Sequence, residues 1–185
     1  MSIAFILFNN ITWLDLVGVY DPITRLKQYG YLPDLHWDIC SFTDTAADQH
    51  GLVVIPTSVK KPLYKYDAII VPGGAGTRTL MHGEDFIEWL HTASAAKYKI
   101  SICTGSLLLD AAGFLKDKKA TTNYKEYEAL QPFCKTVLTD RIVEDGDAIT
   151  AGAVTASIDL GLYLCSKWAG ADAAKDIRKW MDYRG

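Results

Sequence analysis

The stretch Lys99–Leu109, KISICTGSLLL, carries the pattern that sets the fold class. A short run of β-forming residues stops at Cys103, small turn-permissive residues follow, and an apolar helix-like run begins at Leu107. A strand that turns into a helix at one residue lifts that side chain beside the helix N-terminus, where free N–H groups and the helix dipole favour negative charge. A cysteine in this place tends to ionise to a nucleophilic thiolate, as in the hydrolase nucleophile elbow with Cys in place of Ser. The alternative is a buried cysteine without a role, because free Cys is among the most buried residue types.

Length and composition indicate an ordinary globular chain. It has 185 residues, 49% apolar and 22% charged, with a formal net charge of −3. This length suffices for one domain with a full core, which we place at residues 1–185. The sequence has no basic stripe, no apolar run of membrane-spanning length, and no signal-peptide start or cleavage site in Met1–Phe8. We therefore expect a cytoplasmic protein with no nucleic-acid or membrane partner.

The four cysteines are expected to be reduced thiols. None forms a C-x-x-C pair and none has a histidine at zinc-finger spacing, so we expect no metal. Cys40 lies in a β-type run and Cys165 in an apolar helical run, which is typical of inert core positions. The cysteines are Cys40, Cys103, Cys134 and Cys165.

Strand and helix patterns alternate along the chain, which predicts an α/β fold with a mostly parallel central sheet. The expected strands are Ile3–Phe8, His36–Phe42, Gly51–Ile55, Asp67–Pro72, the run ending at Cys103, Ala120–Thr122, and a hairpin over Arg141–Thr150 with an Asp-Gly turn. The expected helices are Thr12–Lys27 with a kink or break at Pro22, Asp85–Ala96, the run from Cys103 to Gly113, Tyr124–Leu130 capped by Asn123, Val154–Trp168 and Asp172–Tyr183.

Three chemically distinctive segments follow predicted strands. They are Asn9–Asp15, Gly73–Thr77 and Cys103–Ser106. Sites in open parallel sheets lie beyond the carboxyl ends of the strands. This coincidence favours a reactive role for Cys103 over a purely structural one.

A nucleophilic cysteine needs hydrogen-bond donors for developing negative charge. The Gly73-Gly74 loop lets the backbone approach a ligand closely, and the N–H groups of Gly74 and Thr104 are the natural pair of donors. The alternative for Gly73-Gly74 is a plain tight turn.

The cysteine also needs a partner that moves protons, and Asp15 is the best candidate because it follows the first strand. The alternative for Asp15 is a capping box with Thr12. No sequence pattern places a histidine near Cys103. The histidines are His36, His50, His82 and His91.

Four ordered motifs resemble the ThiJ/PfpI superfamily, and they are most similar to its isonitrile hydratase branch. The motifs are Asn10–Gly18, Val71–Gly76, Ile102–Thr122 around CTGSLLL, and Gly152–Leu160. The resemblance implies a single-domain, flavodoxin-like three-layer sandwich with a nucleophile elbow. Members similar to this chain are usually homodimers, which we expect here too.

The resemblance also implies site residues and an activity. Cys103 matches the nucleophile, Asp15 the acid that replaces the Glu of other members, Thr104 a residue of the hydratase site, and Gly74 the oxyanion-loop glycine. The implied activity is that of a hydro-lyase, which adds water to a small-molecule isonitrile through a thioimidate and releases an N-substituted formamide without a cofactor.

The sequence departs from the family pattern at one informative position. The usual Thr-Thr-His reads Thr121-Thr122-Asn123, which argues against a Cys–His peptidase or amidase. We also expect no DNA-binding domain of the kind that some similar regulators carry. Two alternatives stay open: a glyoxalase-like or other stress-related hydrolase, and a non-enzymatic redox sensor that oxidises at Cys103.

Overall fold

A central β-sheet organises the computed structural model, which describes residues 1–185. The strands are β1 (Ser2–Leu7), β2 (His36–Ser41), β3 (Ala46–Ala47), β4 (Val53–Val54), β5 (Ser58–Val59), β6 (Ala68–Val71), β7 (Tyr98–Ile102), β8 (Lys119–Ala120), β9 (Thr136–Val137), β10 (Ile142–Asp145) and β11 (Ala148–Ala151). Seven of them form the main sheet in the order β10-β11-β7-β6-β1-β2-β5. Within the main sheet only the β10–β11 pair is antiparallel. The antiparallel pair β3–β4 and the parallel pair β8–β9 lie outside it. The sheet is therefore mostly parallel, as predicted.

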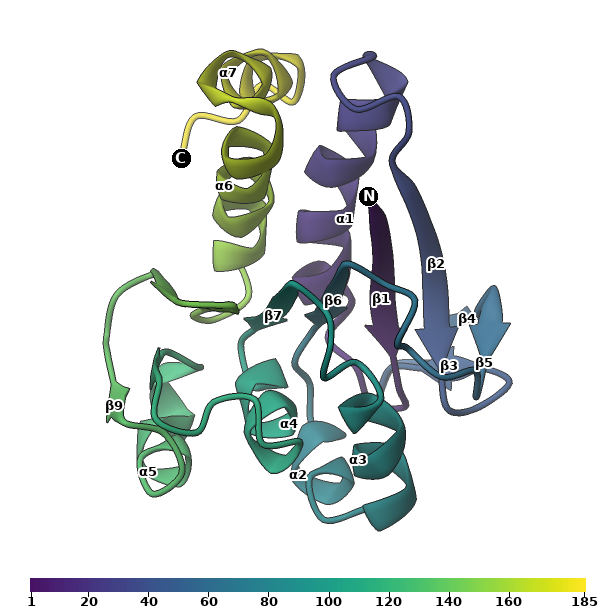
Figure 1. The fold of residues 1–185 in the computed structure, drawn as a ribbon, viewed down its shortest axis with the longest axis vertical. Helices are drawn as coiled ribbons and strands as arrows, with labels where there is room; N and C mark the ends of the chain where they lie inside the picture. Colours follow the sequence, from purple (N-terminus) through teal and green to yellow (C-terminus); the bar gives the residue numbers. More distant parts are fainter.

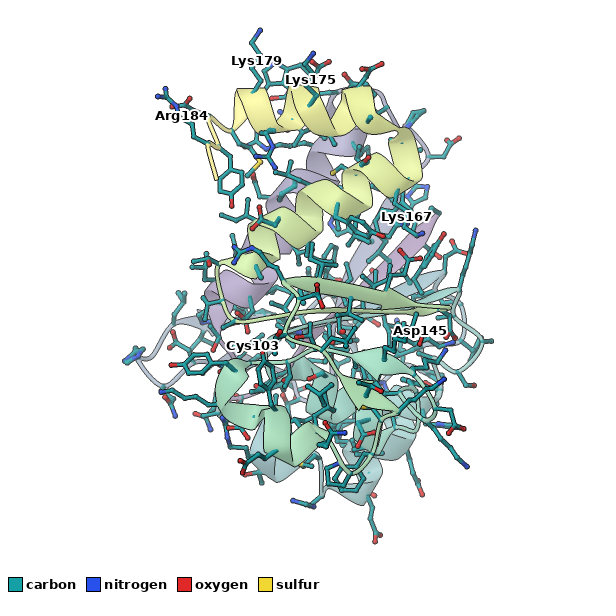
Figure 2. All side chains as sticks on the ribbon, turned by 90° about the vertical axis from the view of Figure 1, so that its left-hand side faces the viewer. Cys103, Asp145, Lys167, Lys175, Lys179 and Arg184 are labelled. Atoms are coloured by element: carbon teal, nitrogen blue, oxygen red, sulfur yellow. The ribbon has the colours of Figure 1, made fainter.

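Helices cover both faces of this sheet. They are α1 (Trp13–Gln28), α2 (Thr77–Leu80), α3 (Glu84–His91), α4 (Gly105–Ala111), the 3₁₀ turn η1 (Tyr124–Glu126), α5 (Tyr127–Leu130), α6 (Ala156–Ala169) and α7 (Ala171–Trp180). Helices α1, α6 and α7 lie on one side of the strands, and α2 to α5 lie on the other (Figure 1). The same three layers are visible after a quarter turn (Figure 2). The flavodoxin-like three-layer sandwich is confirmed.

The two central strands explain why the sequence shows continuous apolar runs. Ile3–Leu7 of β1 and Ala68–Val71 of β6 are fully buried. A parallel strand covered by helices on both faces has no polar side, so its residues do not alternate. The carboxyl ends of these two strands lead into Asn9–Thr12 and Gly73–Gly76, so they position two of the segments that the sequence singled out.

Of the predicted kink or break at Pro22, the break does not occur, because α1 runs through to Gln28; a kink stays a prediction. Here α1 packs closely on α6. A Cβ atom added at Gly161 would lie 2.8 Å from Pro22 Cγ, and one at Gly18 would lie 2.1 Å from Ser157 Oγ. This tight helix–helix contact favours one continuous helix over the local preference of proline.

Several predicted element boundaries differ from the observed ones, because tertiary contacts decide the structure of short segments. The strand expected at Gly51–Ile55 shrinks to β4, which pairs with β3 outside the main sheet. The Arg141–Thr150 hairpin is confirmed, but its turn is Gly146-Asp147, one residue later than predicted, with Gly146 at φ 64°. The helix predicted after Asn123 begins as a 3₁₀ turn, and Asn123 does cap it.

Gly105 at the start of α4 is a position where only glycine fits. A Cβ atom there would lie 2.1 Å from Val71 O and 2.8 Å from Pro72 O, both backbone atoms at the end of β6. We expect Gly105→Ala to lower the free energy of unfolding by about 1–3 kcal/mol or more, because backbone atoms cannot move aside cheaply. Denaturant unfolding measures the loss. Gly83→Ala is the matched control, since the nearest atom to its Cβ would be at 3.4 Å; an equal loss in both variants would contradict the prediction.

Candidate active site

Cys103 sits at a strained turn between β7 and α4. Its φ is +53°, a left-handed conformation that costs a non-glycine residue roughly 1–2 kcal/mol. Its N–H donates to Ala151 O and Gly152 O, each at 3.0 Å, and its carbonyl accepts from Ser106 Oγ at 3.2 Å and Thr122 Oγ1 at 3.0 Å. Figure 2 shows Cys103 where the strands meet the helices of the α4 side. The predicted elbow is present, and hydrogen bonds on both sides of the residue hold its strained backbone.

Asp15 lies in the first turn of α1 and is fully buried. Its Oδ2 accepts from the Gly73 N–H at 2.9 Å, and its Oδ1 is buried with no hydrogen-bond partner. The carboxyl and the Cys103 thiol each shift the pKa of the other, so the two groups lie close enough to interact electrostatically. The alternative capping box is wrong, because Thr12 occupies the N-cap but makes no side-chain cap bond and Asp15 turns to Gly73 instead. The structure thus brings Asp15 and Cys103 together.

Burial dominates the protonation of both groups. It raises the pKa of Asp15 from 3.8 to about 6, although the Gly73 N–H and the Cys103 thiol lower it. Burial also raises the pKa of Cys103, and the charge of Asp15 raises it further. The Asn123 amide and the N–H groups of Thr104 and Val154 lower it. The helix N-terminus alone therefore does not ionise this thiol, contrary to the expectation from the elbow pattern.

The predicted pair of free donors, the N–H groups of Gly74 and Thr104, is not formed. The Gly74 N–H donates to Thr104 Oγ1 at 3.1 Å. Gly74 has φ +140° and bridges Ile11, so its loop is anchored against the end of β1. The Thr104 N–H lowers the pKa of the Cys103 thiol and so acts on the sulfur. Gly74 and Thr104 both lie in the site, but in this arrangement only Thr104 offers its N–H there.

Thr77 is a site residue that the sequence placed at the end of the Gly73–Thr77 segment without giving it a role. It is fully buried, and its Oγ1 donates to Gly74 O at 2.9 Å and lies 3.0 Å from Thr104 Oγ1. This hydroxyl ties the glycine loop to the elbow. A buried threonine just after a glycine run carries no distinctive signal in a single sequence.

We expect Thr77→Val to lower the free energy of unfolding by about 1–2 kcal/mol, because it removes one buried hydrogen bond while keeping the side-chain shape. Chemical denaturation is the measurement. Thr77→Ser keeps the hydroxyl and serves as the control. The prediction fails if the serine variant loses as much stability as the valine variant.

Asn123 stands where the family pattern has histidine, and it contacts the nucleophile directly. Its Nδ2 donates to Cys103 Sγ at 3.3 Å. The sequence had indicated Asn123 only as a helix cap and as a missing base. No histidine takes this place: the hydrogen bond of His91, for example, joins its Nδ1 to Ala112 O at 2.9 Å.

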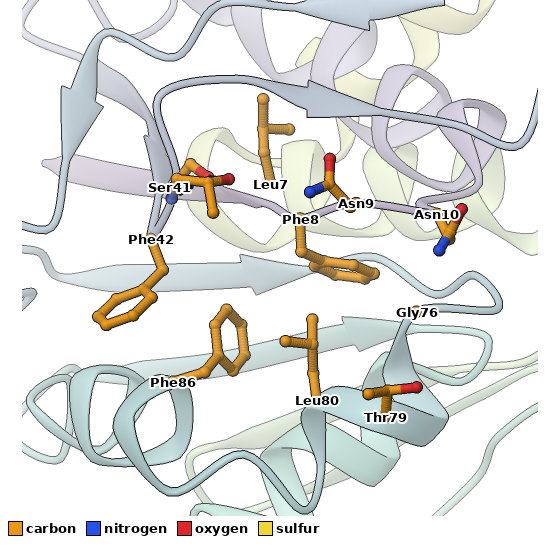
Figure 3. A pocket seen from close by; sticks show the side chains of 11 residues that line it. Leu7, Phe8, Asn9, Asn10, Ser41, Phe42, Gly76, Thr79, Leu80 and Phe86 are labelled. Atoms are coloured by element: carbon orange, nitrogen blue, oxygen red, sulfur yellow. Dashed lines mark hydrogen bonds between the residues drawn. The ribbon is translucent and has the colours of Figure 1, made fainter. Parts of the chain in front are cut away.

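A separate, mostly apolar cavity of about 190 Å³ lies at the end of β1 and is bounded by the glycine loop at Gly76. Phe8, Phe42, Leu80 and Phe86 form its apolar walls (Figure 3). Cys103, Asp15 and Thr104 do not line it. The structure also has no group of three or more His, Cys, Asp and Glu residues that would hold a metal ion, and none of its helices is long and apolar enough to cross a bilayer.

The fold and the site together define an α/β protein with a cysteine at a nucleophile elbow. The sheet is mostly parallel, and a buried carboxyl lies near the cysteine. The chain matches the model of the DJ-1/PfpI family over residues 1–167. It belongs to this family, as the sequence motifs indicated.

Individual relatives agree with this assignment. The chain is 36% identical to an isonitrile hydratase of Pseudomonas putida, over 99% of this chain and 78% of the relative. It is 25% identical to the HTH-type transcriptional regulator GbdR of Pseudomonas aeruginosa, over 98% of this chain but only 50% of the regulator. Among solved structures, a ThiJ/PfpI family protein from Pseudomonas syringae has a TM-score of 0.89 at 28% identity, covering 100% of this chain and 75% of that one. The family thus contains both an enzyme and a regulator similar to this chain.

Proposed function

We propose that this protein is an isonitrile hydratase-like hydro-lyase, which adds water to an isonitrile and releases an N-substituted formamide. The observation that carries the proposal is the buried Asp15 carboxyl, with a pKa of about 6, beside Cys103. The amide of Asn123 also contacts the sulfur, with its Nδ2 at 3.3 Å. The 36% identical isonitrile hydratase of Pseudomonas putida supports the same reaction class.

The first step is a proton exchange within the Asp15–Cys103 pair. The thiol proton passes to the Asp15 carboxylate, so the pair carries one negative charge before and after the transfer. The thiolate then attacks the isonitrile carbon and forms a C–S bond. Asp15 returns the proton to that carbon, which gives a thioimidate. A carboxyl with a pKa near 6 suits a group that must act as both acid and base near neutral pH.

The second step hydrolyses the thioimidate. The Asp15 carboxylate takes a proton from water as the water oxygen attacks the same carbon, and this proton passes to the nitrogen. The tetrahedral intermediate then breaks its C–S bond, so the formamide leaves and the sulfur regains the hydroxyl proton. The Thr104 N–H is placed to donate to negative charge near the sulfur. Water is consumed and no redox partner is needed.

The direct test is incubation of the purified protein with several simple alkyl isonitriles and detection of the matching formamides. Turnover that depends on enzyme concentration supports the proposal. Absence of formamide across the whole series would refute it. Lactate formation from methylglyoxal, measured in parallel, would instead indicate the glyoxalase-like alternative.

One observation weighs against the redox-sensor alternative. Cys103 is 4% exposed and burial raises its pKa, so the resting thiol is not the exposed, readily ionised group of a sensor cysteine; the proposed hydration instead forms the thiolate by proton transfer to Asp15. Mass spectrometry after mild peroxide treatment separates the two: selective oxidation of Cys103 without any isonitrile turnover would favour a sensor. A homodimer and a cytoplasmic location stay predictions from the resemblance and the sequence.

A further inference from the structure

We propose that the Asn123 side-chain amide is a catalytic hydrogen-bond donor that stabilises the Cys103 thiolate and fixes the position of its sulfur. Asn123 Nδ2 lies 3.3 Å from Cys103 Sγ, within hydrogen-bond range for sulfur. The inference rests on the proposed function only where it calls this donor catalytic. The hydrogen bond from Asn123 affects the ionisation of the Cys103 thiol whatever reaction the site performs.

The helix cap decides which end of the amide meets the sulfur. Asn123 Oδ1 accepts from the Lys125 N–H at 3.0 Å. A backbone N–H only donates, so the carbonyl oxygen must face Lys125 and the NH₂ group must face Cys103. The orientation therefore follows from the chemistry of the two partners. An Asn at this N-cap presents a permanent donor to the nucleophile.

The segment that carries Asn123 is held rigidly against the elbow. Thr121 N–H donates to Thr150 Oγ1 at 2.8 Å, and Thr122 Oγ1 donates to Cys103 O at 3.0 Å. Both threonines are buried. The donor and the sulfur are thus fixed to the same strand ends, which keeps their distance constant at little entropic cost.

The electrostatic surroundings give the amide a specific task. Asp15 is the charged group that opposes ionisation of Cys103. Farther along the same segment, Glu126 forms an ion pair with Arg78, so these two charges offset each other. Among the groups that favour the thiolate, the Asn123 amide has the largest influence, followed by the N–H groups of Thr104 and Val154. A neutral donor stabilises the thiolate without itself titrating, so the proton remains with Asp15.

The experiment compares Asn123→Ser and Asn123→Asp, because Ser and Asp are both good N-caps. Both variants keep an acceptor for the Lys125 N–H and remove the NH₂ group that reaches the sulfur. Ionised aspartate has no donor, and the serine hydroxyl ends one bond short of the position of Nδ2. Glu128→Gln, an exposed change in the same helical segment, is the control. The ultraviolet absorbance of the thiolate is titrated with pH in each protein. Subtraction of a Cys103→Ala titration isolates Cys103 from the other three cysteines.

We expect the Cys103 titration midpoint to rise by about one pH unit in Asn123→Ser, which is about a tenfold loss of thiolate at a given pH. Asn123→Asp should shift it further, because it places a second carboxylate near the sulfur. Thermal unfolding should stay close to that of the unmodified protein in both. Midpoints equal to that of Glu128→Gln in both variants would overturn the inference.

Formamide production measured on the same samples separates this inference from the proposed function. Shifted midpoints with no turnover in any protein would uphold the donor role and refute the hydratase. Normal turnover with unshifted midpoints would uphold the hydratase and refute the donor role. A merely structural Asn123 would move the unfolding temperature and leave the midpoint in place.

Discussion

Cys103→Ala is expected to reduce isonitrile hydration to the uncatalysed background. The proposed C–S bond cannot form without the sulfur, and losing the nucleophile of a covalent mechanism costs on the order of 10⁶-fold in turnover. Neither Cys40 nor Cys165 can substitute, because both are buried away from the site in contact with Tyr66 and Pro22. Formamide production by the variant, compared with protein-free samples, measures the effect.

A Cys103→Gly variant provides the matched control for the fold. Both variants lack the sulfur, but glycine adopts φ +53° without strain, whereas alanine does not. Glycine at a normal helical position is about 1 kcal/mol less stable than alanine. Here we expect the glycine variant to be at least as stable as the alanine variant in urea unfolding. If alanine were clearly the more stable, the elbow would not be strained at this residue.

Asp15→Asn is expected to lower turnover by about 10²- to 10⁴-fold, the usual contribution of a general acid–base group. The asparagine keeps the size of the side chain and an acceptor for the Gly73 N–H, so the loop stays in place. What it loses is the ability to take and return a proton. Steady-state formamide production on a simple alkyl isonitrile is the measurement, and a variant with near-normal turnover would remove Asp15 from the mechanism.

The same substitution is expected to stabilise the fold at neutral pH. The pKa of the Asp15 carboxyl is about 6 in the folded protein, and its ordinary value, which applies to the unfolded chain, is 3.8. Between about pH 4 and pH 6 the folded chain therefore binds this proton more tightly than the unfolded chain does. Stability contributed by this group is present below about pH 4 and is lost as the pH rises through 6. At pH 7 the buried charge therefore costs about 1–3 kcal/mol, which Asp15→Asn removes.

Urea unfolding at several pH values tests this linkage. The stability advantage of Asp15→Asn should be largest above pH 6 and should shrink towards pH 4. Asp110→Asn is the control, because burial also raises the pKa of Asp110 to about 6 but Asp110 lies on the outer part of α4. It should gain stability in the same pH range, to a smaller extent, and keep its turnover. An advantage of Asp15→Asn that does not change with pH would contradict the assignment.

Sequence patterns predicted the elements whose signals are local. The apolar runs of β1 and β6, the strand-to-helix break at Cys103 and the cap at Asn123 all depend on neighbouring residues. The errors fall where distant contacts decide. Pro22 stays helical where α1 packs on α6, and Val53–Val54 of the Gly51–Ile55 segment pairs with β3 outside the main sheet.

The candidate site shows the same division. The elbow pattern located Cys103, and the position after β1 indicated Asp15, because strand ends in a parallel sheet share one edge. Their joint burial is a tertiary property, and it reversed the expected ionisation: the thiol pKa is raised, not lowered. The hydroxyl of Thr77 and the engaged N–H of Gly74 are equally invisible in a sequence, since both depend on how two loops meet.

The sequence by itself determined the α/β class, the family motifs and the segments at the strand ends, because these follow from local periodicity and from motif order. Only the tertiary structure decided which groups surround the sulfur. Burial, the charge of Asp15 and the direction of the Asn123 amide depend on distances between segments far apart in the chain. Electrostatic free energies change steeply with such distances and with exclusion of water, so they emerge only when the chain is folded.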